Sequence, residues 1–384
     1  MLAIGLNLSS YRIYIVELLK SRENLIIRKM VKAEVPSSSI IKGEIHNPEV
    51  LAGNLKEIWK KYKIPDRKVF IGIANQKVIA KEIKIPVVND EEIHNSIKYQ
   101  INDFIPIPKN NIIYDYYVIE KGEGYSRIML VGAMKSMIDD VVSSFKRAGL
   151  LAQAIDLNCF ALYRTMNHIY NFEKNEKNSQ HGTFCVVNIG LETSIIEMIQ
   201  DNDLKYPRFT STSIRNFIDE IYKEIKEDIK YCEQVISGFD YNFLIIKKNK
   251  SVKKEETKNS PDKSGGKTDS KTDKNNTGIN IDKDKIAGIM KRIADRFVEE
   301  IKLSIEHFLQ ESPKSRVGKI ILTGEYIKNI DRYIEQEIEY KVELLNISDY
   351  FSLKHLKDSA GSSEGLKYIL DPLAIGMALR GLNQ

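Results

Sequence analysis

The first half of the chain begins with three apolar runs, each ended by a short polar turn. Residues 2–8 and 12–19 are mostly apolar, and residues 25–35 follow as a third run. These patterns are typical of three strands joined as hairpins. Residues 48–62 then place leucine and isoleucine at helical spacing behind a proline in the first turn, and residues 68–74 form another apolar run. The predicted order is therefore three strands, one helix and a fourth strand.

The second half repeats this order after a polar break at residues 173–182. The pattern predicts three strands, two long helices and a last strand, at residues 183–190, 192–200, 205–212, 213–236, 284–310 and 319–324. A repeat of this kind is typical of two ribonuclease-H-like units, and we expect a cleft between them. The predicted fold class is α/β.

An additional segment interrupts the first unit between residues 78 and 151. It contains a predicted helix with Asp90 as its N-cap, two strands at residues 112–120 and 127–134, and a second helix at residues 136–150. This order predicts a small α+β subdomain inserted into the first unit.

Composition places the chain among soluble globular proteins. Of its 384 residues, 42% are hydrophobic and 29% charged. No apolar run reaches the ~20 residues of a membrane-spanning helix. The three cysteines are widely separated, and the six histidines form no HExxH pattern. We therefore expect a cytoplasmic protein without a metal site.

The net charge of +5 is concentrated in one polar segment. Residues 248–278 contain nine lysines against five acidic residues, so four of the five net positive charges lie there. Residues 248–284 are too polar to bury a core, and we expect a disordered insertion. The remainder has almost no surplus from which to build a basic face, which argues against nucleic acid as a partner.

Three turns have the composition of phosphate- or nucleoside-binding segments. Two are equivalent hairpin turns that begin at Asn7 and Asn188, and the third follows the predicted strand that ends at Gly324. Backbone N–H groups and hydroxyls in such turns bind phosphates. The candidate residues are Asn7, Ser9, Ser10, Asn188, Gly190, Glu192, Thr193, Gly324 and Glu325. Asparagine at both hairpins lacks the charge that Mg²⁺ prefers and cannot act as a general base.

Several stretches resemble the type IV pilus assembly protein PilM family, which is part of the actin-like superfamily together with the cell-division protein FtsA. They include residues 4–18, 186–199 and 371–382, and the inserted stretch in which FIPIP precedes YDYYV is the most specific. The resemblance implies an actin-like fold of two domains. Its parts would be subdomain 1A at 1–77, inserted subdomain 1C at 78–151, a return to 1A at 152–180, subdomain 2A at 181–212, subdomain 2B at 213–310, and a return to 2A with the closing helix at 311–384.

The resemblance also implies an ATP site with Mg²⁺, from which this chain departs. The family pattern has Asp where this chain has Asn7 and Asn188, commonly Gly in place of Ser9, and commonly Gly in place of Glu325. These differences leave nucleotide binding open and make hydrolysis an unexpected activity.

By resemblance, the chain is a non-enzymatic adaptor. Family members bind the cytoplasmic N-terminal peptide of PilN between subdomains 1A and 1C, contact pilus motor ATPases, and reach the inner face of the membrane only through PilN. The candidate peptide-binding residues here are Ile83, Ile85, Pro86, Tyr114 and Tyr116. An extended peptide beside a sheet is bound by main-chain hydrogen bonds and alternate side-chain pockets.

Two alternatives remain at this stage. An FtsA-like filament protein would carry an amphipathic membrane helix after a flexible tail, whereas this sequence stops directly after its last apolar helix. A small-molecule kinase of the same fold would need a carboxylate base where this chain has amides.

Overall fold

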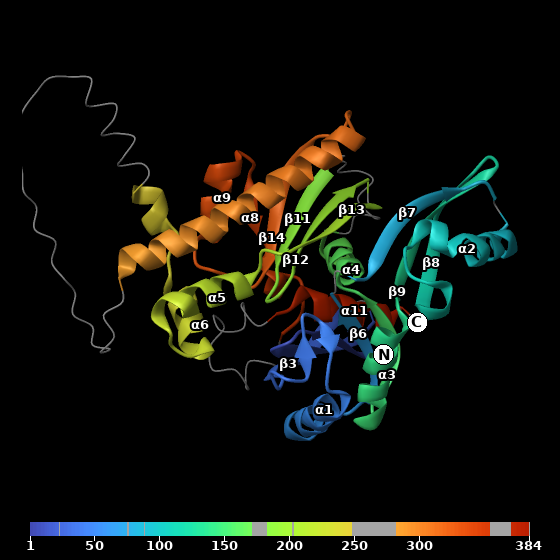
Figure 1. Ribbon diagram of the computed structural model, residues 1–384, viewed down its shortest axis with the longest axis horizontal. Helices are drawn as coiled ribbons and strands as arrows, with labels where there is room; N and C mark the ends of the chain where they lie inside the picture. The colour runs from blue at the N-terminus through green and yellow to red at the C-terminus, as the bar shows by residue number, and fades with distance from the viewer. Residues whose placement is uncertain are drawn as a thin grey trace, which may run out of the picture. The chain divides into compact units, whose positions relative to one another are not determined.

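The computed structural model describes residues 1–22, 24–74, 77–87, 89–170, 183–201, 203–247, 282–353 and 370–383. They belong to two compact units. The first comprises Met1–Asn178 with Asn346–Gln384, and the second is Ser179–Leu345 (Figure 1). The predicted break at 173–182 and all but the last three residues of the predicted insertion at 248–284 lie outside the described residues.

The first unit is built on a five-stranded sheet in the order β10-β6-β1-β2-β3. Its strands are β1 (Leu2–Leu8), β2 (Arg12–Ser21), β3 (Asn24–Glu34), β6 (Lys68–Ile73) and β10 (Leu151–Leu157). β1, β2 and β3 form two antiparallel hairpins, whereas β6 runs parallel to both β1 and β10. The three predicted hairpin strands and the fourth strand are confirmed.

Among the described residues, helices and a short hairpin pack around this sheet, apart from the inserted subdomain. They are α1 (Pro48–Tyr62), α3 (Lys135–Arg147), α4 (Asn158–Tyr170), α11 (Pro372–Leu382), β4 (Ile40–Ile41) and β5 (Glu44–Ile45). A 3₁₀ turn, η2 (Ile347–Asp349), also belongs to it. The helix predicted at residues 48–62 is confirmed, and its Leu51, Leu55 and Ile58 are buried. The proline at its first turn and Asn47, whose side chain accepts a hydrogen bond from the N–H of Val50, explain where it begins.

The closing helix α11 packs on the first sheet, not on the second. It contacts β1, β2, β6 and α4, so the sequence assignment that grouped it with the return to subdomain 2A is corrected. Glycine permits the close contact, because a Cβ atom at Gly5 would lie 2.0 Å from the carbonyl oxygen of Ala374. The last helix of the chain thus completes the core of its first domain.

The inserted subdomain is a three-stranded antiparallel sheet with one long helix on it. Its elements are β7 (Ile79–Ile85), α2 (Asp90–Phe104), the 3₁₀ turn η1 (Lys109–Asn111), β8 (Ile112–Gly122) and β9 (Tyr125–Met134), with the strand order β7-β9-β8. The N-cap of α2 is Asn89, whose side chain accepts a hydrogen bond from the N–H of Glu91 at 2.9 Å, so the assignment of Asp90 as the cap is one residue late.

The second unit repeats the sheet of the first. β11 (Thr183–Ile189), β12 (Ser194–Gln200) and β13 (Asp203–Thr210) are antiparallel neighbours, and β14 (Val317–Gly324) and β15 (Val342–Leu344) continue the sheet in parallel. The order β13-β12-β11-β14-β15 is the topology of the first sheet. The predicted duplication of a ribonuclease-H-like unit is confirmed.

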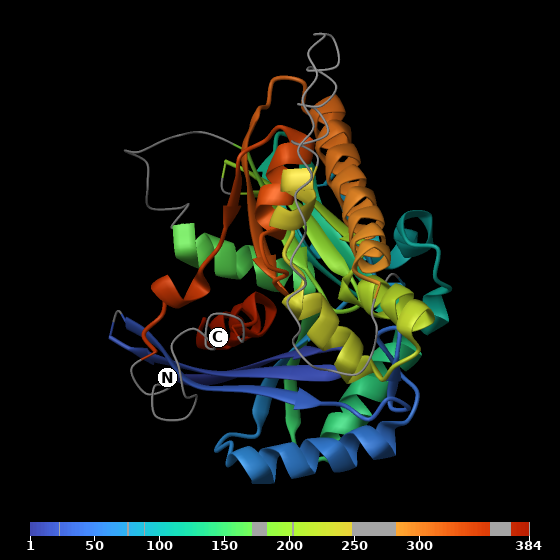
Figure 2. The ribbon, with the colours of Figure 1, turned by 90° about the vertical axis from the view of Figure 1, so that its left-hand side faces the viewer.

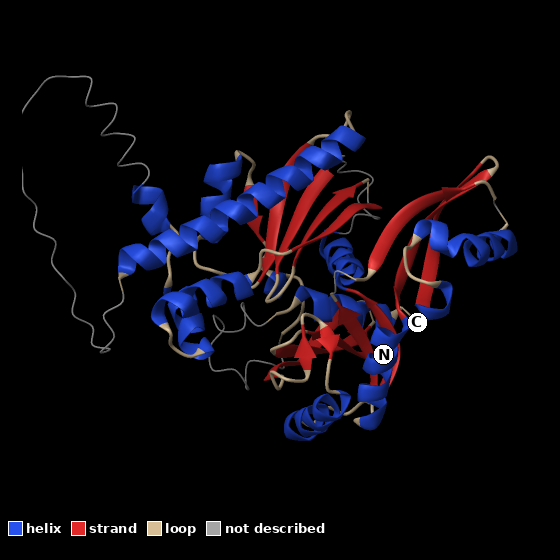
Figure 3. Cartoon of the chain, in the orientation of Figure 1, coloured by secondary structure: helices blue, strands red, loops and turns tan. Residues whose placement is uncertain are grey.

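The helices of the second unit correct one prediction. Those with bounds in the described residues include α5 (Ile214–Ile225), α6 (Ile229–Gly238), α8 (Lys283–Glu311) and α9 (Ile330–Ile338) (Figure 3). The single helix predicted at residues 213–236 is two helices, because Lys226 takes a left-handed conformation and Asp228 caps α6. Across the described ranges, no helix combines the length and the apolar character needed to cross a membrane.

Candidate functional site

The first candidate turn begins with a hydrogen-bonded chain of three polar side chains. Asn7, near the end of β1, is 8% exposed, and its Nδ2 donates to Oδ2 of Asp371 at 2.9 Å. The Oδ1 of Asn7 accepts from Nδ2 of Asn158 at 3.0 Å. Asp371 is also the N-cap of α11, where its Oδ1 accepts from the N–H of Ala374 at 2.7 Å. Asn7 therefore joins β1 to the first residues of two helices.

This cluster contains a carboxylate that the sequence analysis did not place there. Asp371 lies 364 positions from Asn7, and neither pattern nor spacing connects them. The acidic group at this turn is on residue 371, and residue 7 is its hydrogen-bond donor.

The two serines of the first turn are engaged with neighbouring backbone groups. The hydroxyl of Ser9 donates to the carbonyl oxygen of Arg12 at 2.8 Å and accepts from the N–H of Arg12 at 3.2 Å, while its own N–H donates to the same carbonyl at 3.0 Å. Ser10 is 2% exposed, and its hydroxyl lies 3.5 Å from the N–H of Gly43. The donors that a phosphate would need at Ser9 are thus used by the chain itself.

The second and third candidate turns come together at one end of the second sheet. Asn188 on β11 pairs with Thr323 on β14, and Ile189 pairs with Gly324. The N–H of Gly190 donates to the hydroxyl of Ser194 at 3.2 Å. Glu192 and Thr193, both half-buried, complete this turn.

Gly324 is required by its backbone conformation and by its neighbours. Its φ is +92°, and a Cβ atom would lie 2.3 Å from the carbonyl oxygen of Ile189 and 2.8 Å from Nδ2 of Asn188. The N–H of Glu325 donates to that same carbonyl at 2.8 Å. The space beside the Cα of Gly324 is therefore occupied by Ile189 and Asn188 of the protein itself.

These turns do not fit a magnesium–triphosphate group as they stand. Asn7, Asn188 and the N–H groups of Ser9, Gly190 and Glu325 are each engaged or uncharged, and in the described ranges no three His, Cys, Asp or Glu side chains are grouped to hold a metal.

A buried acid lies deeper in the second sheet. Glu197 on β12 is fully buried, and among the described residues neither of its carboxylate oxygens has a hydrogen-bond partner. Burial raises the pKa of the Glu197 carboxyl well above its usual range, because the charged form is poorly solvated there. Its neighbour in the register is Val186 on β11. A single glutamate in an apolar strand gave no sequence signal for this environment.

The structure places most of the predicted peptide-binding residues in the core of the inserted subdomain. Ile83 and Ile85 are 7% and 1% exposed and pack with α2, and Tyr114 and Tyr116 pack partly against the same core. Pro86 is exposed. Four of the five residues thus occupy the covered face of the sheet, because strand side chains alternate between faces.

The opposite face of this sheet is buried at Met129 and Ala133 of β9 and exposed along β8, and we call it the open face. Its aromatic and apolar members include Ile113 and Tyr117 on β8, which are 39% and 47% exposed. The ring of Tyr117 lies edge-on to that of Phe160 on α4, with centroids 6.3 Å apart. The open face therefore adjoins the first helix turn after β10, where the inserted subdomain meets the first sheet.

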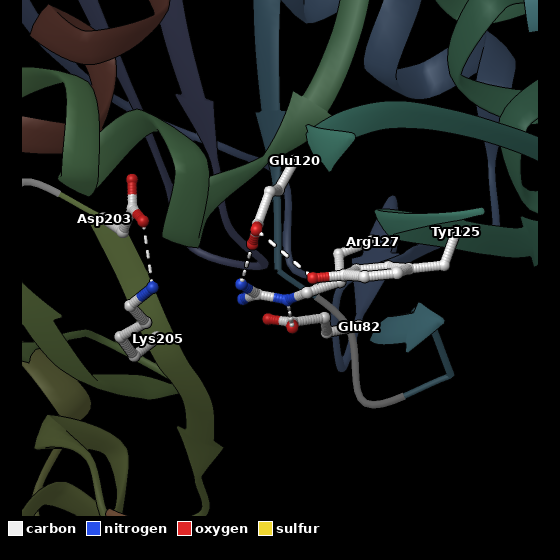
Figure 4. A network of polar contacts seen from close by, with 6 residues as sticks. All are labelled: Glu82, Glu120, Tyr125, Arg127, Asp203 and Lys205. Carbon is white, nitrogen blue, oxygen red and sulfur yellow. Dashed lines mark hydrogen bonds and ion pairs between the residues drawn. The ribbon is translucent and has the colours of Figure 1, made fainter. Parts of the chain in front are cut away.

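Charged side chains on the open face form a network around Arg127 (Figure 4). Its Nε donates to Glu82 at 2.7 Å and its Nη1 to Glu120 at 2.6 Å. The hydrogen bond to Glu82, and then that to Glu120, raise the pKa of Arg127 above its ordinary value against the opposing effect of burial. The ammonium of Lys84 lies 3.8 Å from the ring centroid of Tyr125. Figure 4 also draws the ion pair of Lys205 with Asp203, which belongs to β13 of the second unit.

The two duplicated sheets, each with three antiparallel strands followed by two parallel ones, define a protein of the actin-like class. The solved structures include similar folds. The chain resembles a structure of a PilM–PilN type IV pilus biogenesis complex with a TM-score of 0.76 and 17% identity, covering 99% of this chain and 98% of that one. It also resembles MreB5 of Spiroplasma citri bound to ADP (TM-score 0.49, 10% identity, 95% and 97% covered) and EutJ of Carboxydothermus hydrogenoformans (TM-score 0.47, 11% identity, 98% and 90% covered).

Within this class, the family follows from the sequence match. A model of the type IV pilus assembly protein PilM matches residues 5–234 and 266–382. The chain belongs to the PilM family of type IV pilus assembly proteins.

Proposed function

We propose that this protein is a non-catalytic scaffold of the type IV pilus inner-membrane platform. It would bind the cytoplasmic N-terminal peptide of PilN and relay between that membrane-anchored partner and the pilus motor ATPases. Membership of the PilM family supports the pilus role, and similarity to a chain of a PilM–PilN complex supports PilN as the partner. The proposed location is the cytoplasmic face of the inner membrane.

The observation that carries the peptide-binding proposal is the open face of the inserted sheet. One side of that sheet is sealed by α2, while Ile113 and Tyr117 remain exposed on the other side, beside Phe160 of α4. An extended peptide gains binding energy from an aromatic anchor of this kind and from alternate side-chain pockets. We therefore assign peptide contact to Tyr117 in place of Tyr116 and Ile85.

A fluorescence-anisotropy titration with the labelled N-terminal peptide of PilN tests this assignment. We expect Tyr117→Ala to weaken binding about tenfold, because loss of a partly exposed aromatic anchor costs roughly 1–2 kcal/mol. Tyr99→Ala is the matched control, since Tyr99 is 78% exposed on α2, in the helix that covers the other side of the sheet. Equal affinity of the two variants would remove the open face from the peptide site.

A further inference from the structure

The outer side of α1, the loop after it and the first residue of β6 form a basic surface, which we call the lysine face. Its members are exposed: Lys56, Lys60, Lys61, Lys63, Arg67 and Lys68. The stretch from residue 56 to residue 68 contains only two acidic residues, Glu57 and Asp66. The carboxylate of Asp66 is turned toward the backbone, where its Oδ1 accepts from the N–H groups of Arg67 at 2.6 Å and Lys68 at 3.1 Å.

Helix geometry explains why these charges share one side. Leu51, Leu55 and Ile58 are buried beneath the helix, so Lys56 and Lys60, four residues apart, lie together on its outer side. Lys63 follows the helix as its C-cap, in a left-handed conformation, and is exposed. In Figure 2 this blue helix lies along the lower border of the first unit. In the part of the chain that the structure describes, no ion pair joins these three lysines to an acidic side chain.

The loop that carries the remaining charges is fixed to the helix. Nε1 of the buried Trp59 donates to the carbonyl oxygen of Asp66 at 2.9 Å. Lys29 of β3 donates to the carbonyl oxygens of Tyr62 and Lys63, at 2.6 and 2.9 Å, at the C-terminus of the helix. The lysine face is therefore a preorganised surface with a seventh cation at its border.

The net charge outside residues 248–278 is close to zero, and this sum gives no sign of the lysine face. Summed charge argues against a basic face only if positive and negative residues are evenly mixed, and here six basic residues lie within thirteen positions. Local charge density, and not the total, determines the potential that a large charged partner meets within a Debye length of about 10 Å.

We propose that the lysine face binds the surface of an anionic phospholipid bilayer. Lysine ammonium groups on the side of a helix attract a diffuse layer of headgroups without needing a shaped pocket. Each lysine near such a surface increases partitioning about fivefold, so the face gives reversible binding by itself. The role of this bilayer contact in the cell rests on the proposed function. Binding to a membrane-anchored peptide partner would hold the protein near the bilayer and so raise the effective concentration of the bilayer at the lysine face.

Co-sedimentation of the full chain alone with lipid vesicles tests the proposal. Vesicles of phosphatidylcholine mixed with phosphatidylglycerol should sediment the protein, and vesicles of phosphatidylcholine alone should not. The triple variant K56E/K60E/K63E should lose at least tenfold in partitioning, and high salt should have the same effect on the wild type. No peptide is present, so failure here leaves the Tyr117 titration as a separate test of the scaffold.

The matched control is K98E/K230E/K314E, which changes the net charge by the same amount at three exposed lysines on other elements. It should keep most of the vesicle binding, and circular dichroism should show both variants folded. Equal loss in the two variants, or binding that survives K56E/K60E/K63E, would overturn the proposal. Labelled duplex DNA provides a further test. If the wild type binds DNA more tightly than it binds vesicles, and K56E/K60E/K63E abolishes that DNA binding, the proposal is overturned in favour of a nucleic-acid surface.

Discussion

At the scale of single residues, Asn7 is hydrogen-bonded to a carboxylate far along the chain, that of Asp371. An aspartate at position 7 would face the Asp371 carboxylate at a distance where Asn7 now donates a hydrogen bond of 2.9 Å. Two carboxylates that close cannot both ionise without cost. The amide at position 7 instead donates to the acid at position 371, which also caps α11.

We expect Asn7→Asp to lower the free energy of unfolding of the first unit by about 2–3 kcal/mol, because it replaces a hydrogen bond with carboxylate repulsion. The double variant Asn7→Asp/Asp371→Asn should recover most of that loss, since an amide at 371 can donate to a carboxylate at 7 and still cap the helix. Urea denaturation of the wild type, both single variants and the double variant measures the coupling. Losses that simply add in the double variant would contradict the pairing.

At the scale of elements, sequence pattern served best where one helix or strand face is buried. Helix α1 was predicted at the residues where it occurs, because its apolar spacing and the proline at its first turn indicate the same boundary. The prediction of one helix at residues 213–236 was wrong at Lys226. The apolar spacing continues past this residue, although the chain leaves the helical conformation there. Alternation along β7 and β8 separated two faces of a sheet but could not tell which face α2 covers.

Closing helix α11 provides a test of packing at this scale. A Cβ atom at Gly376 would lie 1.9 Å from the carbonyl oxygen of Ala161 on α4. We expect Gly376→Ala to destabilise the protein by about 1–3 kcal/mol, because the two helices would have to separate. Thermal unfolding followed by circular dichroism measures this.

Gly53→Ala is the control for that measurement. A Cβ atom at Gly53, on α1, would have no neighbour within 4 Å, so alanine should stabilise the helix by about 0.5–1 kcal/mol. A similar melting temperature for the two variants would mean that α4 and α11 are not in the contact described.

At the scale of the whole molecule, the first unit is formed by two separate segments of the chain. Its first unit is completed by α11, which is held at β10 and α4 by ion pairs of Asp156 with Arg380, at 2.6 Å, and with Arg164. In the sequence, the second unit is therefore inserted between the two segments of the first. Both units keep the duplicated sheet, and the strand residue that begins the hairpin turn is an asparagine in each, Asn7 and Asn188.

We expect the intact protein to show no binding heat with ATP and Mg²⁺ in isothermal titration, because Ser9, Gly190 and Glu325 donate their N–H groups within the chain. The same preparation should bind the PilN peptide, which serves as the control for folded protein. A saturable heat with ATP and Mg²⁺ would show that these turns rearrange to admit phosphate.

The sequence by itself determined the duplication, the inserted subdomain and the three candidate turns, because periodicity and turn composition are local properties that survive without knowledge of contacts. Only the tertiary structure decided that Asp371 lies beside Asn7, that Ile83 and Ile85 are interior, and that six basic residues on α1, its following loop and the first residue of β6 share one surface. Each of these depends on which residues, distant along the chain or alternating along a strand, are brought to the same side, and packing alone sets that.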